Sequence, residues 1–332
     1  MNIEKKGNIS PEEQEKGKEC ILKIWKYYNA RIVGQKSLGI SLMISLIANG
    51  HILLESVPGL AKTTAAKVLT DAVGARFSRI QCTPDLLPSD IIGTEIFNYS
   101  TSEFETKLGP VFANFVLLDE INRSSAKTQS AMLEAMQERQ ASIGGKTYRM
   151  PGLFIVIATQ NPIEQEGTYL LAEAQLDRFL LKENLTYPSV EEELLVLDRI
   201  EKNAFAKSEP VLKIEDVAFL QKLAKKVYID DSIKKYIIEI IDATRHSEKY
   251  ISRDLAQYVE LGSSTRGAIA FMEASKALAL INGRSYVIPE DIKTLRHTVL
   301  RHRIALNYTA LADEVTVEKI IDSIIGAIKT PW

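Results

Sequence analysis

Residues 51–63 constrain the fold of this 332-residue chain more than any other segment. They run from an apolar, strand-like stretch through a tight loop to Lys62 and Thr63, and residues that favour a helix follow. This order is typical of a phosphate-binding loop, in which backbone N–H groups and a helix N-terminus face the anion. In such a loop a lysine reaches the β- and γ-phosphates and a hydroxyl group binds magnesium. The strict pattern has glycine where this chain has Ser56 and Ala61, so the loop alone does not decide the fold.

The segments around this loop predict an α/β domain with a parallel five-stranded sheet. Short apolar runs rich in strand-forming residues alternate with helical patterns as far as Tyr187, which is the signature of parallel strands covered by helices on both faces. The helix after the loop is expected to end at Gly74, and another to begin at Ser124 or Ser125. The strands are predicted at residues 51–54, 76–81, 115–118, 154–158 and 179–185.

Two further segments predict β-hairpin insertions in this α/β plan. The first pairs residues 93–99 with 103–107 around a turn at 100–102. The second pairs residues 140–143 with 147–149 around a turn at 144–146. Lys146 would then lie at a hairpin tip, where it could contact nucleic acid. A solvated lysine is the simpler interpretation, because the formal net charge of the chain is −2.

The predicted secondary structure changes at Pro188, beyond which the sequence shows helical patterns and no convincing strand pattern. We therefore predict a polar N-terminal arm at 1–18, the α/β domain at 19–187 and an all-helical domain at 188–332. In the last domain, Asp230 or Asp231 is expected to cap one helix and Ser263 or Ser264 to open another. Further helices are expected from Pro289 onward and at residues 312–329, with a loop at 204–212.

Polar residues follow two of the predicted strands. Asp119 and Glu120 end the apolar run at 115–118, where one carboxylate can bind magnesium and the other can orient and deprotonate an attacking water. An acidic turn is the alternative for an isolated run of this kind. Asn161 follows the strand at 154–158 and could lie near a γ-phosphate, although Asn161-Pro162 is equally typical of a simple turn.

The composition narrows the class of protein and its partners. Acidic residues number 43 and lysine plus arginine 41, so nothing in the overall charge favours nucleic acid as a partner. No apolar run is long enough to span a membrane, and residues 1–18 lack the apolar stretch of a signal peptide, which predicts a cytoplasmic protein. Cys20 and Cys82 are expected to be free thiols, and the four histidines show no metal-ligand spacing.

Four motifs in order resemble the MoxR family of AAA+ ATPases over residues 20–332. They lie at residues 58–63, 118–123, 158–162 and 173–179. The resemblance implies ATP and magnesium as cofactors and an ATPase core followed by a helical lid. It also implies an ATP-dependent hexameric ring that remodels or assembles another protein. The family further carries an insert in helix 2 and a hairpin before the strand that ends at Asn161, which match the two predicted hairpins.

The family pattern assigns roles to individual residues of this chain. It implies that Asn161 is sensor 1, that Arg178 is the arginine finger acting on a neighbouring subunit, and that Arg266 is sensor 2. Without the pattern, an Asp177–Arg178 surface pair and a solvent-exposed Arg266 would be the simpler interpretations. The nucleotide-binding residues that it implies, besides Asp119, are Val33, Gly34 and Gln35 on the adenine side and Ser56, Val57, Pro58, Gly59, Leu60, Ala61, Lys62, Thr63 and Thr64 in the loop, with Thr63 and Asp119 holding magnesium.

Ser56 is the main departure from the pattern. A serine there costs about 1 kcal/mol if its φ is positive and little otherwise. We expect an active ATPase with a protein partner that carries a von Willebrand factor A (VWA) domain, as the resemblance implies. Three alternatives stay open: a motor subunit of a magnesium-chelatase type, a nucleotide-gated scaffold with little turnover, and a DNA-translocating motor.

Overall fold

The computed structural model describes residues 9–57, 59–162, 169–201 and 209–331. By compactness the chain divides into two units. The sheet unit comprises Leu22–Gln175 and Glu183–Ala218, and the helical unit comprises Met1–Ile21, Leu176–Lys182 and Phe219–Trp332. The predicted domains divide the chain after residues 18 and 187, where the pattern of predicted strands and helices changes. The two compact units are divided differently, because the helical unit combines residues 1–21, 176–182 and 219–332.

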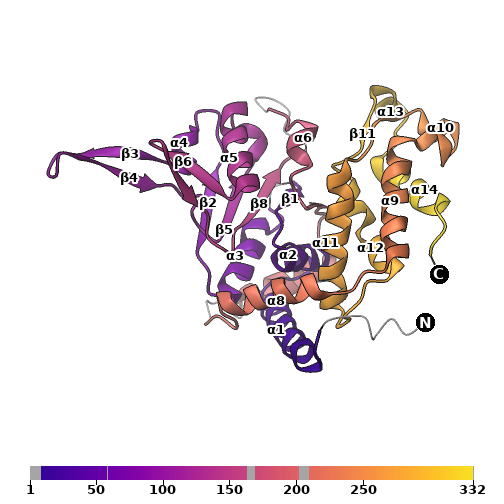
Figure 1. Cartoon of the computed structure of the whole chain (residues 1–332), viewed down its shortest axis with the longest axis horizontal. Coiled ribbons are helices and arrows are strands. Elements are labelled where there is room, and N and C mark those ends of the chain that lie inside the picture. The colour runs from indigo at the N-terminus through magenta and orange to yellow at the C-terminus, as the bar shows by residue number, and fades with distance from the viewer. Residues whose placement is uncertain (1–8, 58, 163–168, 202–208, 332) are drawn as a thin grey trace. The chain divides into compact units, whose positions relative to one another are not determined.

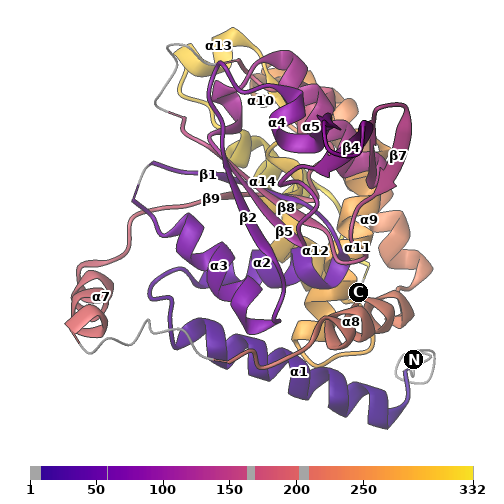
Figure 2. The ribbon, with the colours of Figure 1, turned by 90° about the vertical axis from the view of Figure 1, so that its left-hand side faces the viewer.

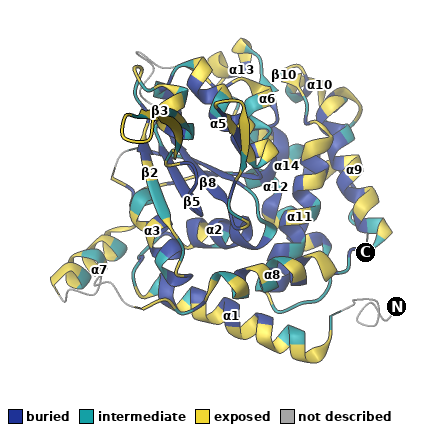
Figure 3. Cartoon of the chain, turned by 60° about the vertical axis from the view of Figure 1, so that its left-hand side comes forward, coloured by how far each residue is buried: buried dark blue, intermediate teal, exposed yellow. Residues whose placement is uncertain are grey.

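A five-stranded parallel sheet with the order β2-β5-β8-β1-β9 forms the centre of the sheet unit (Figure 1), which confirms the predicted fold class. Strands β5 and β8 begin with apolar runs because they lie inside the sheet, and all their residues except the last of each strand are buried, which is dark blue in Figure 3. The strands are β1 Ile52–Glu55, β2 Phe77–Gln81, β5 Phe115–Asp119, β8 Ile155–Gln160 and β9 Leu181–Asn184.

The register of the strands brings their carboxyl ends together. Gln81 of β2 pairs with Asp119 of β5, and Glu55 of β1 pairs with Gln160 of β8. Since all these strands run parallel, the loops that leave β1, β2, β5 and β8 start from the same edge of the sheet. Ligands of open α/β sheets bind outside this edge.

The helices of the sheet unit begin and end at the residues that the sequence indicates. Helix α3 is followed by Gly74, whose φ of +61° suits the left-handed end of a helix. Ser125 caps α5 and accepts a hydrogen bond from the Thr128 N–H at 3.3 Å. The helices are α2 Lys36–Ala48, α3 Lys62–Ala72, α4 Pro88–Ile92, a 3₁₀ turn Ile121–Arg123, α5 Ala126–Glu138, α6 Glu173–Leu176 and α7 Val190–Glu201, and α1 Pro11–Asn29 precedes them (Figure 2).

Both predicted hairpins form. Strand β3 (Gly93–Asn98) pairs with β4 (Glu103–Leu108), and this hairpin extends away from the sheet (Figure 1). Strand β6 (Gln140–Ile143) pairs with β7 (Lys146–Arg149). Its turn is Gly144-Gly145 alone, with φ of +56° and +77°, as two-residue hairpin turns require. Lys146 is therefore the first residue of β7 and not a turn residue, which corrects the prediction.

The helical unit contains the predicted helices after residue 218. The apolar stripe of α9 (Asp231–Arg245) is buried, Asp230 caps this helix, and Ser264 caps α11 (Thr265–Ile281). Pro289 is the first residue of α12 (Pro289–Leu300). The remaining helices are α8 Ile214–Lys226, which begins in the sheet unit, a 3₁₀ turn Ser247–Lys249, α10 Arg253–Ala256, α13 Tyr308–Ala312 and α14 Val317–Ala327.

Two details after residue 188 differ from the expectation. A short antiparallel pair, β10 (Val259–Leu261) with β11 (Ala305–Leu306), joins the loops before α11 and after α12. Such short strands carry too little periodicity to be seen in sequence. The helix expected at 312–329 is shorter, because α13 ends at Ala312 and Thr316 caps α14. Most of the loop expected at 204–212 lies outside the described residues.

The cysteine and membrane predictions can be compared with the described residues. Cys20 and Cys82 are both free and buried, as predicted, and burial raises the pKa of the Cys82 thiol to about 12. Among the helices that the structure describes, none combines the length and apolar character that crossing a bilayer requires.

Candidate active site

The loop after β1 folds sharply and leads directly into α3. Its described residues with positive φ are Gly59 (+88°) and Ala61 (+55°), and Ala61 is the residue before the first turn of α3. Ser56 is buried, does not have a positive φ, and donates its backbone N–H to the Gln160 carbonyl at 3.1 Å. The condition for a conformational cost at Ser56 is therefore not met, and the strained position is Ala61. Pro58 lies outside the described residues.

We expect Ser56→Gly to change ATP affinity by less than about threefold, since no strain is relieved at this position. Ala61→Gly should remove about 1–2 kcal/mol of strain from the folded state, because glycine adopts the left-handed conformation freely. The greater conformational freedom of glycine in the unfolded chain should offset about 0.4–1 kcal/mol of this gain in the free energy of unfolding. Calorimetry with ATP and thermal unfolding of both variants measure the two effects. A several-hundredfold gain in affinity for Ser56→Gly would show instead that the serine deforms the loop.

A cavity of about 440 Å³ opens beside this loop in the sheet unit. Lys62 lies in it and donates a long hydrogen bond of 3.4 Å to the Ser56 carbonyl. Burial lowers the pKa of Lys62, and the negative charges of Asp119 and Glu120 oppose this shift. A polyphosphate could add to that opposing charge and keep the lysine protonated. The cavity is lined by Gly59, Leu60, Ala61, Lys62, Thr63, Thr64, Arg79, Gln81, Asp119 and Glu120.

The two carboxylates at the end of β5 are held by the neighbouring strand β8. Thr159 donates its hydroxyl to Asp119 Oδ1 at 2.8 Å and accepts the Glu120 N–H at 2.8 Å. Glu120 has a φ of +58°, so the chain turns sharply after the strand. Asn161 is buried one residue beyond the end of β8. Thr159 is thus a site residue that the sequence prediction missed, although it stands in the motif quoted for Asn161.

Strand β2 contributes two further side chains that sequence reasoning missed. Arg79 Nη2 lies 2.6 Å from Asp119 Oδ2, and Gln81 donates to Glu120 Oε2 at 3.1 Å. Arg123 also contacts Glu120, with 3.2 Å between Nε and Oε2. Residues 79 and 81 share one face of β2, because side chains alternate along a strand. This face meets the carboxylates because β2 lies next to β5 in the sheet. The order of the strands could not be predicted from the sequence, so neither residue was assigned to the site.

The segment predicted to touch the adenine lies elsewhere in the sheet unit. Gly34 has a φ of +72°, and a Cβ atom at this position would lie 2.7 Å from Glu192 Oε2. Gln35 is buried and donates to the Thr186 carbonyl at 3.2 Å. Gly34 and Gln35 thus lie against residues that follow β9, and none of Val33, Gly34 and Gln35 is among the residues that line the cavity.

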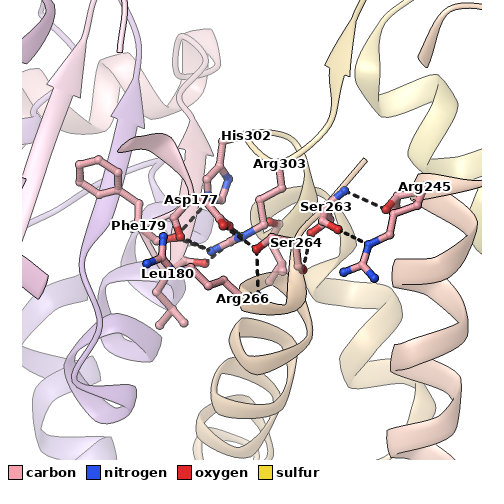
Figure 4. A network of polar contacts seen from close by, with 11 residues as sticks. Asp177, Phe179, Leu180, Arg245, Ser263, Ser264, Arg266, His302 and Arg303 are labelled. Carbon is pink, nitrogen blue, oxygen red and sulfur yellow. Dashed lines mark hydrogen bonds and ion pairs between the residues drawn. The ribbon is translucent and has the colours of Figure 1, made fainter. Parts of the chain in front are cut away.

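Arg178 and Arg266 belong to the helical unit, and Figure 4 shows the surroundings of Arg266 together with Asp177, the residue before Arg178. Arg178 follows α6, and its buried Nε has no hydrogen-bond partner among the described residues. Arg266 is exposed in the first turn of α11. Asp177 pairs with Arg303, with 2.8 Å between Oδ1 and Nε, and so the simple Asp177–Arg178 pair considered from the sequence does not form.

Arg303 is a strongly buried cation, with a side chain that is 2% exposed. Burial lowers its pKa to about 10, and the negative charge of Asp177 opposes the shift. Removing one partner of a buried ion pair of this kind costs about 3–5 kcal/mol, because the other charge is left without compensation. The ion pair therefore strongly stabilises the contact between the turn after α6 and the turn after α12.

The described residues contain no group of three or more histidine, cysteine or acidic side chains that could hold a metal ion by themselves. Thr63 and Asp119 instead bring two oxygen donors to the cavity. Magnesium binds such oxygens together with nucleotide phosphates rather than in a cage built by protein alone. The donor set thus fits magnesium that arrives with a nucleotide.

Two family models match this chain. Residues 51–181 match the ATPase family associated with various cellular activities (AAA), and residues 252–324 match the AAA lid domain. Chaperone MoxR1 of Mycobacterium tuberculosis is 47% identical over 300 residues, which are 90% of this chain and 79% of that protein. The uncharacterized protein YeaC of Bacillus subtilis is 47% identical over 307 residues, covering 92% of this chain and 93% of that protein.

A solved structure agrees with the sequence relatives. The crystal structure of a protein from Cytophaga hutchinsonii superimposes with a TM-score of 0.90 at 46% identity, covering 96% of this chain and 97% of that one. This similarity covers nearly the whole chain, the sheet unit and the helical unit alike. The chain belongs to the MoxR family of AAA+ ATPases, and it hydrolyses ATP.

Proposed function

We propose that this ATPase works as a ring-forming, chaperone-like remodeller or assembly factor for a partner protein. The relative named Chaperone MoxR1 supports the chaperone role, as it is similar over most of both chains. The observation that carries the proposal is the hairpin β3–β4, which presents apolar side chains to solvent next to an ATPase core. The relatives favour this function over a chelatase motor, which activity with chelatase partner subunits would test.

We propose roles for the site residues from the family resemblance, supported by the cavity that Lys62, Thr63, Asp119 and Glu120 line together. Lys62 binds the β- and γ-phosphates, Glu120 orients the attacking water, and Asn161 responds to the γ-phosphate. Thr63 and Asp119 hold magnesium, which neutralises phosphate charge when it is bound with the nucleotide. Val33, Gly34 and Gln35 receive the adenine side. Arg178 acts on the nucleotide of a neighbouring subunit, and Arg266 acts as sensor 2.

The Arg79 guanidinium would compete with magnesium for Asp119, because it lies 2.6 Å from Oδ2. Arg79→Ala is expected to lower the magnesium concentration for half-maximal binding of a fluorescent ATP analogue by about two- to fivefold, the range of a partly exposed ion pair. Lys67→Ala is the charge-matched control, since Lys67 is exposed on α3 outside the cavity. An unchanged magnesium requirement in Arg79→Ala would contradict the competition.

The two hairpins form one substructure. The Thr106 hydroxyl lies 2.8 Å from the Tyr148 hydroxyl, and a Cβ atom on Gly144 would overlap the Glu95 carboxylate. The rings of Phe97 and Tyr99 lie 5.2 Å apart, and Tyr99 is 89% exposed. Such an exposed aromatic cluster is typical of a surface that binds another protein. The exposed apolar side chains of the first hairpin are Ile96, Phe97, Tyr99, Phe104 and Leu108.

The proposed partner carries a VWA domain, and the hairpin couples it to hydrolysis. Tyr99→Ser should leave basal ATPase activity within about twofold and reduce the stimulation by such a partner at least fivefold, because an exposed aromatic anchor is lost. Tyr308→Ser is the matched control, since Tyr308 is 93% exposed in the helical unit. The measurement is ATP turnover with increasing amounts of the partner.

The outcomes of this titration separate the remaining functions. If basal and stimulated rates fall together in Tyr99→Ser, the hairpin serves the ring and not the partner. Stimulation by DNA in place of the protein would favour a translocating motor. Shortening the Gly144-Gly145 turn is a less specific test, because Gly144 packs on Glu95 of the first hairpin.

A further inference from the structure

Three consecutive residues after α12 hold the short segment that carries Arg178. Arg301 Nη1 donates to the Lys182 carbonyl at 3.3 Å, and His302 Nε2 lies 3.1 Å from the Phe179 carbonyl oxygen. Arg303 contacts the same segment four times, through Asp177 Oδ1 and the carbonyl oxygens of Asp177, Phe179 and Leu180 (Figure 4). The backbone on both sides of Arg178 is therefore fixed by the turn after α12.

The second carboxylate oxygen of Asp177 reaches a different element. The Ser264 hydroxyl donates to Asp177 Oδ2 at 2.6 Å. The same hydroxyl caps α11 by accepting the Arg266 N–H at 3.0 Å. The Asp177 carboxylate is therefore linked through the Ser264 hydroxyl to the backbone of Arg266. Its other oxygen, Oδ1, accepts a hydrogen bond from Arg303 (Figure 4).

Neither of the two arginines at the ends of this connection forms an ion pair with another residue that the structure describes. The Arg178 Nε is buried without a hydrogen bond, and no ion pair of Arg266 occurs among the described residues. A cation in the first turn of a helix is unfavourable, because the helix N-terminus is itself positive. Asp177 is already bound by Arg303 and Ser264. Arg178 and Arg266 are thus positioned to bind anions from outside this unit.

We propose that Asp177, Ser264 and Arg303 form an interlock that makes Arg178 and Arg266 move as one rigid piece. The inference rests on the proposed roles of these arginines, Arg178 on the neighbour's nucleotide and Arg266 as sensor 2. A rigid connection then links the nucleotide states of adjacent subunits, and the linkage must act equally in both directions for binding. Asp177, Ser264 and Arg303 are positioning residues, since they act through the two arginines.

Ser264→Ala tests the interlock with little risk to folding, because Ser264 is exposed. It removes the bond to Asp177 and the cap of α11. We expect the turnover number to fall about tenfold and the Hill coefficient for ATP to approach 1, while the affinity for a fluorescent ATP analogue stays within about threefold, because small misplacements of catalytic groups mainly slow the reaction. Thr316→Ala is the matched control: Thr316 caps α14 in the same unit by accepting the Lys319 N–H at 3.3 Å.

Arg303→Lys and Asp177→Asn should show the same pattern with a larger loss, of about a hundredfold in turnover. Arg284→Lys controls for the loss of a buried ion pair. Arg284 Nη2 lies 2.5 Å from Asp291 Oδ1, and this pair has no hydrogen bond to Asp177, Ser264 or Arg303 among the described residues. A purely structural role predicts lower thermal stability with normal turnover and cooperativity in the folded fraction. That result, or a Hill coefficient of 1 in the wild-type protein, would overturn the interlock.

Single variants of the two arginines distinguish failure of the interlock from failure of the proposed roles. If Arg178→Ala and Arg266→Ala both turn over normally, the proposed roles are wrong and the interlock has no function. If both are slow while Ser264→Ala keeps wild-type turnover and cooperativity, the roles stand and only the interlock is overturned. Slow, non-cooperative turnover in all three supports the proposal.

Discussion

Glu120→Gln is expected to bind ATP within about threefold of the wild-type affinity and to lose at least a thousandfold in hydrolysis, whereas Lys62→Ala is expected to lose binding. The lysine lines the cavity, and in its proposed role it contacts the phosphates in the bound ground state, so its removal weakens binding itself. The glutamate acts mainly in the transition state, and glutamine keeps its shape but cannot accept the proton of the attacking water.

Titration of a fluorescent ATP analogue and a phosphate-release assay on the same preparations separate the two effects. Glu134→Gln is a suitable control, because Glu134 is exposed on α5 and does not line the cavity. Equal loss of binding in Glu120→Gln and Lys62→Ala would contradict the roles assigned to them. The Glu120→Gln protein is also the best reagent for capturing the partner, since it should hold the ATP-bound state.

Arg178→Ala is expected to bind ATP nearly normally and to hydrolyse it about 10³–10⁵-fold more slowly, the range known for arginine fingers. The physical reason is the unpaired guanidinium nitrogen, which is buried beside Asp177 and has no partner among the described residues. An arginine that serves a neighbouring subunit needs no anion in its own chain. Turnover and nucleotide affinity of the purified variant measure the effect.

Mixing Arg178→Ala with Lys62→Ala protein tests whether the arginine acts between subunits. One variant supplies an intact nucleotide site and the other an intact finger, so part of the turnover should return. Sedimentation with and without magnesium and ATP must first show that mixed rings form, as expected for a head-to-tail contact that closes. No rescue in demonstrated mixed rings would falsify the role between subunits, and monomers that ignore nucleotide would contradict the ring.

The strands and the loop could be predicted from sequence because each is a local pattern. The apolar run of β5 ends at Asp119, and the run of β1 ends in the loop that carries Lys62. Arg79 and Gln81 could not be assigned, because their role depends on β2 lying next to β5, and strand order is a property of the whole sheet. The cost of Ser56 also stayed conditional in the sequence, since only backbone geometry shows that the left-handed residue of the loop is Ala61 and not Ser56.

Arg303 was missed for a related reason. Its partner Asp177 stands 126 positions earlier in the chain, and no local pattern connects the two. The sequence did place Arg178 and Arg266 as candidates, through a resemblance and not through any physical signal in their own segments. What it could not supply is the buried connection between them, which involves a residue that reads as one more cation in a basic stretch after α12.

The three separate stretches that make up the helical unit also have a consequence for biosynthesis. Asp177 leaves the ribosome 126 residues before its partner Arg303. Gln14 donates its side-chain amide to the Gly283 carbonyl at 2.8 Å and leaves the ribosome 269 residues before Gly283. At about 5–20 residues per second, the segment with Arg178 waits about 6–25 s for its partner. The sheet unit can complete its strands during translation, but the helical unit closes only after Arg303 has been synthesised. Nascent chains are therefore expected to form the cavity beside Lys62 before the contacts that hold the segment around Arg178 are complete.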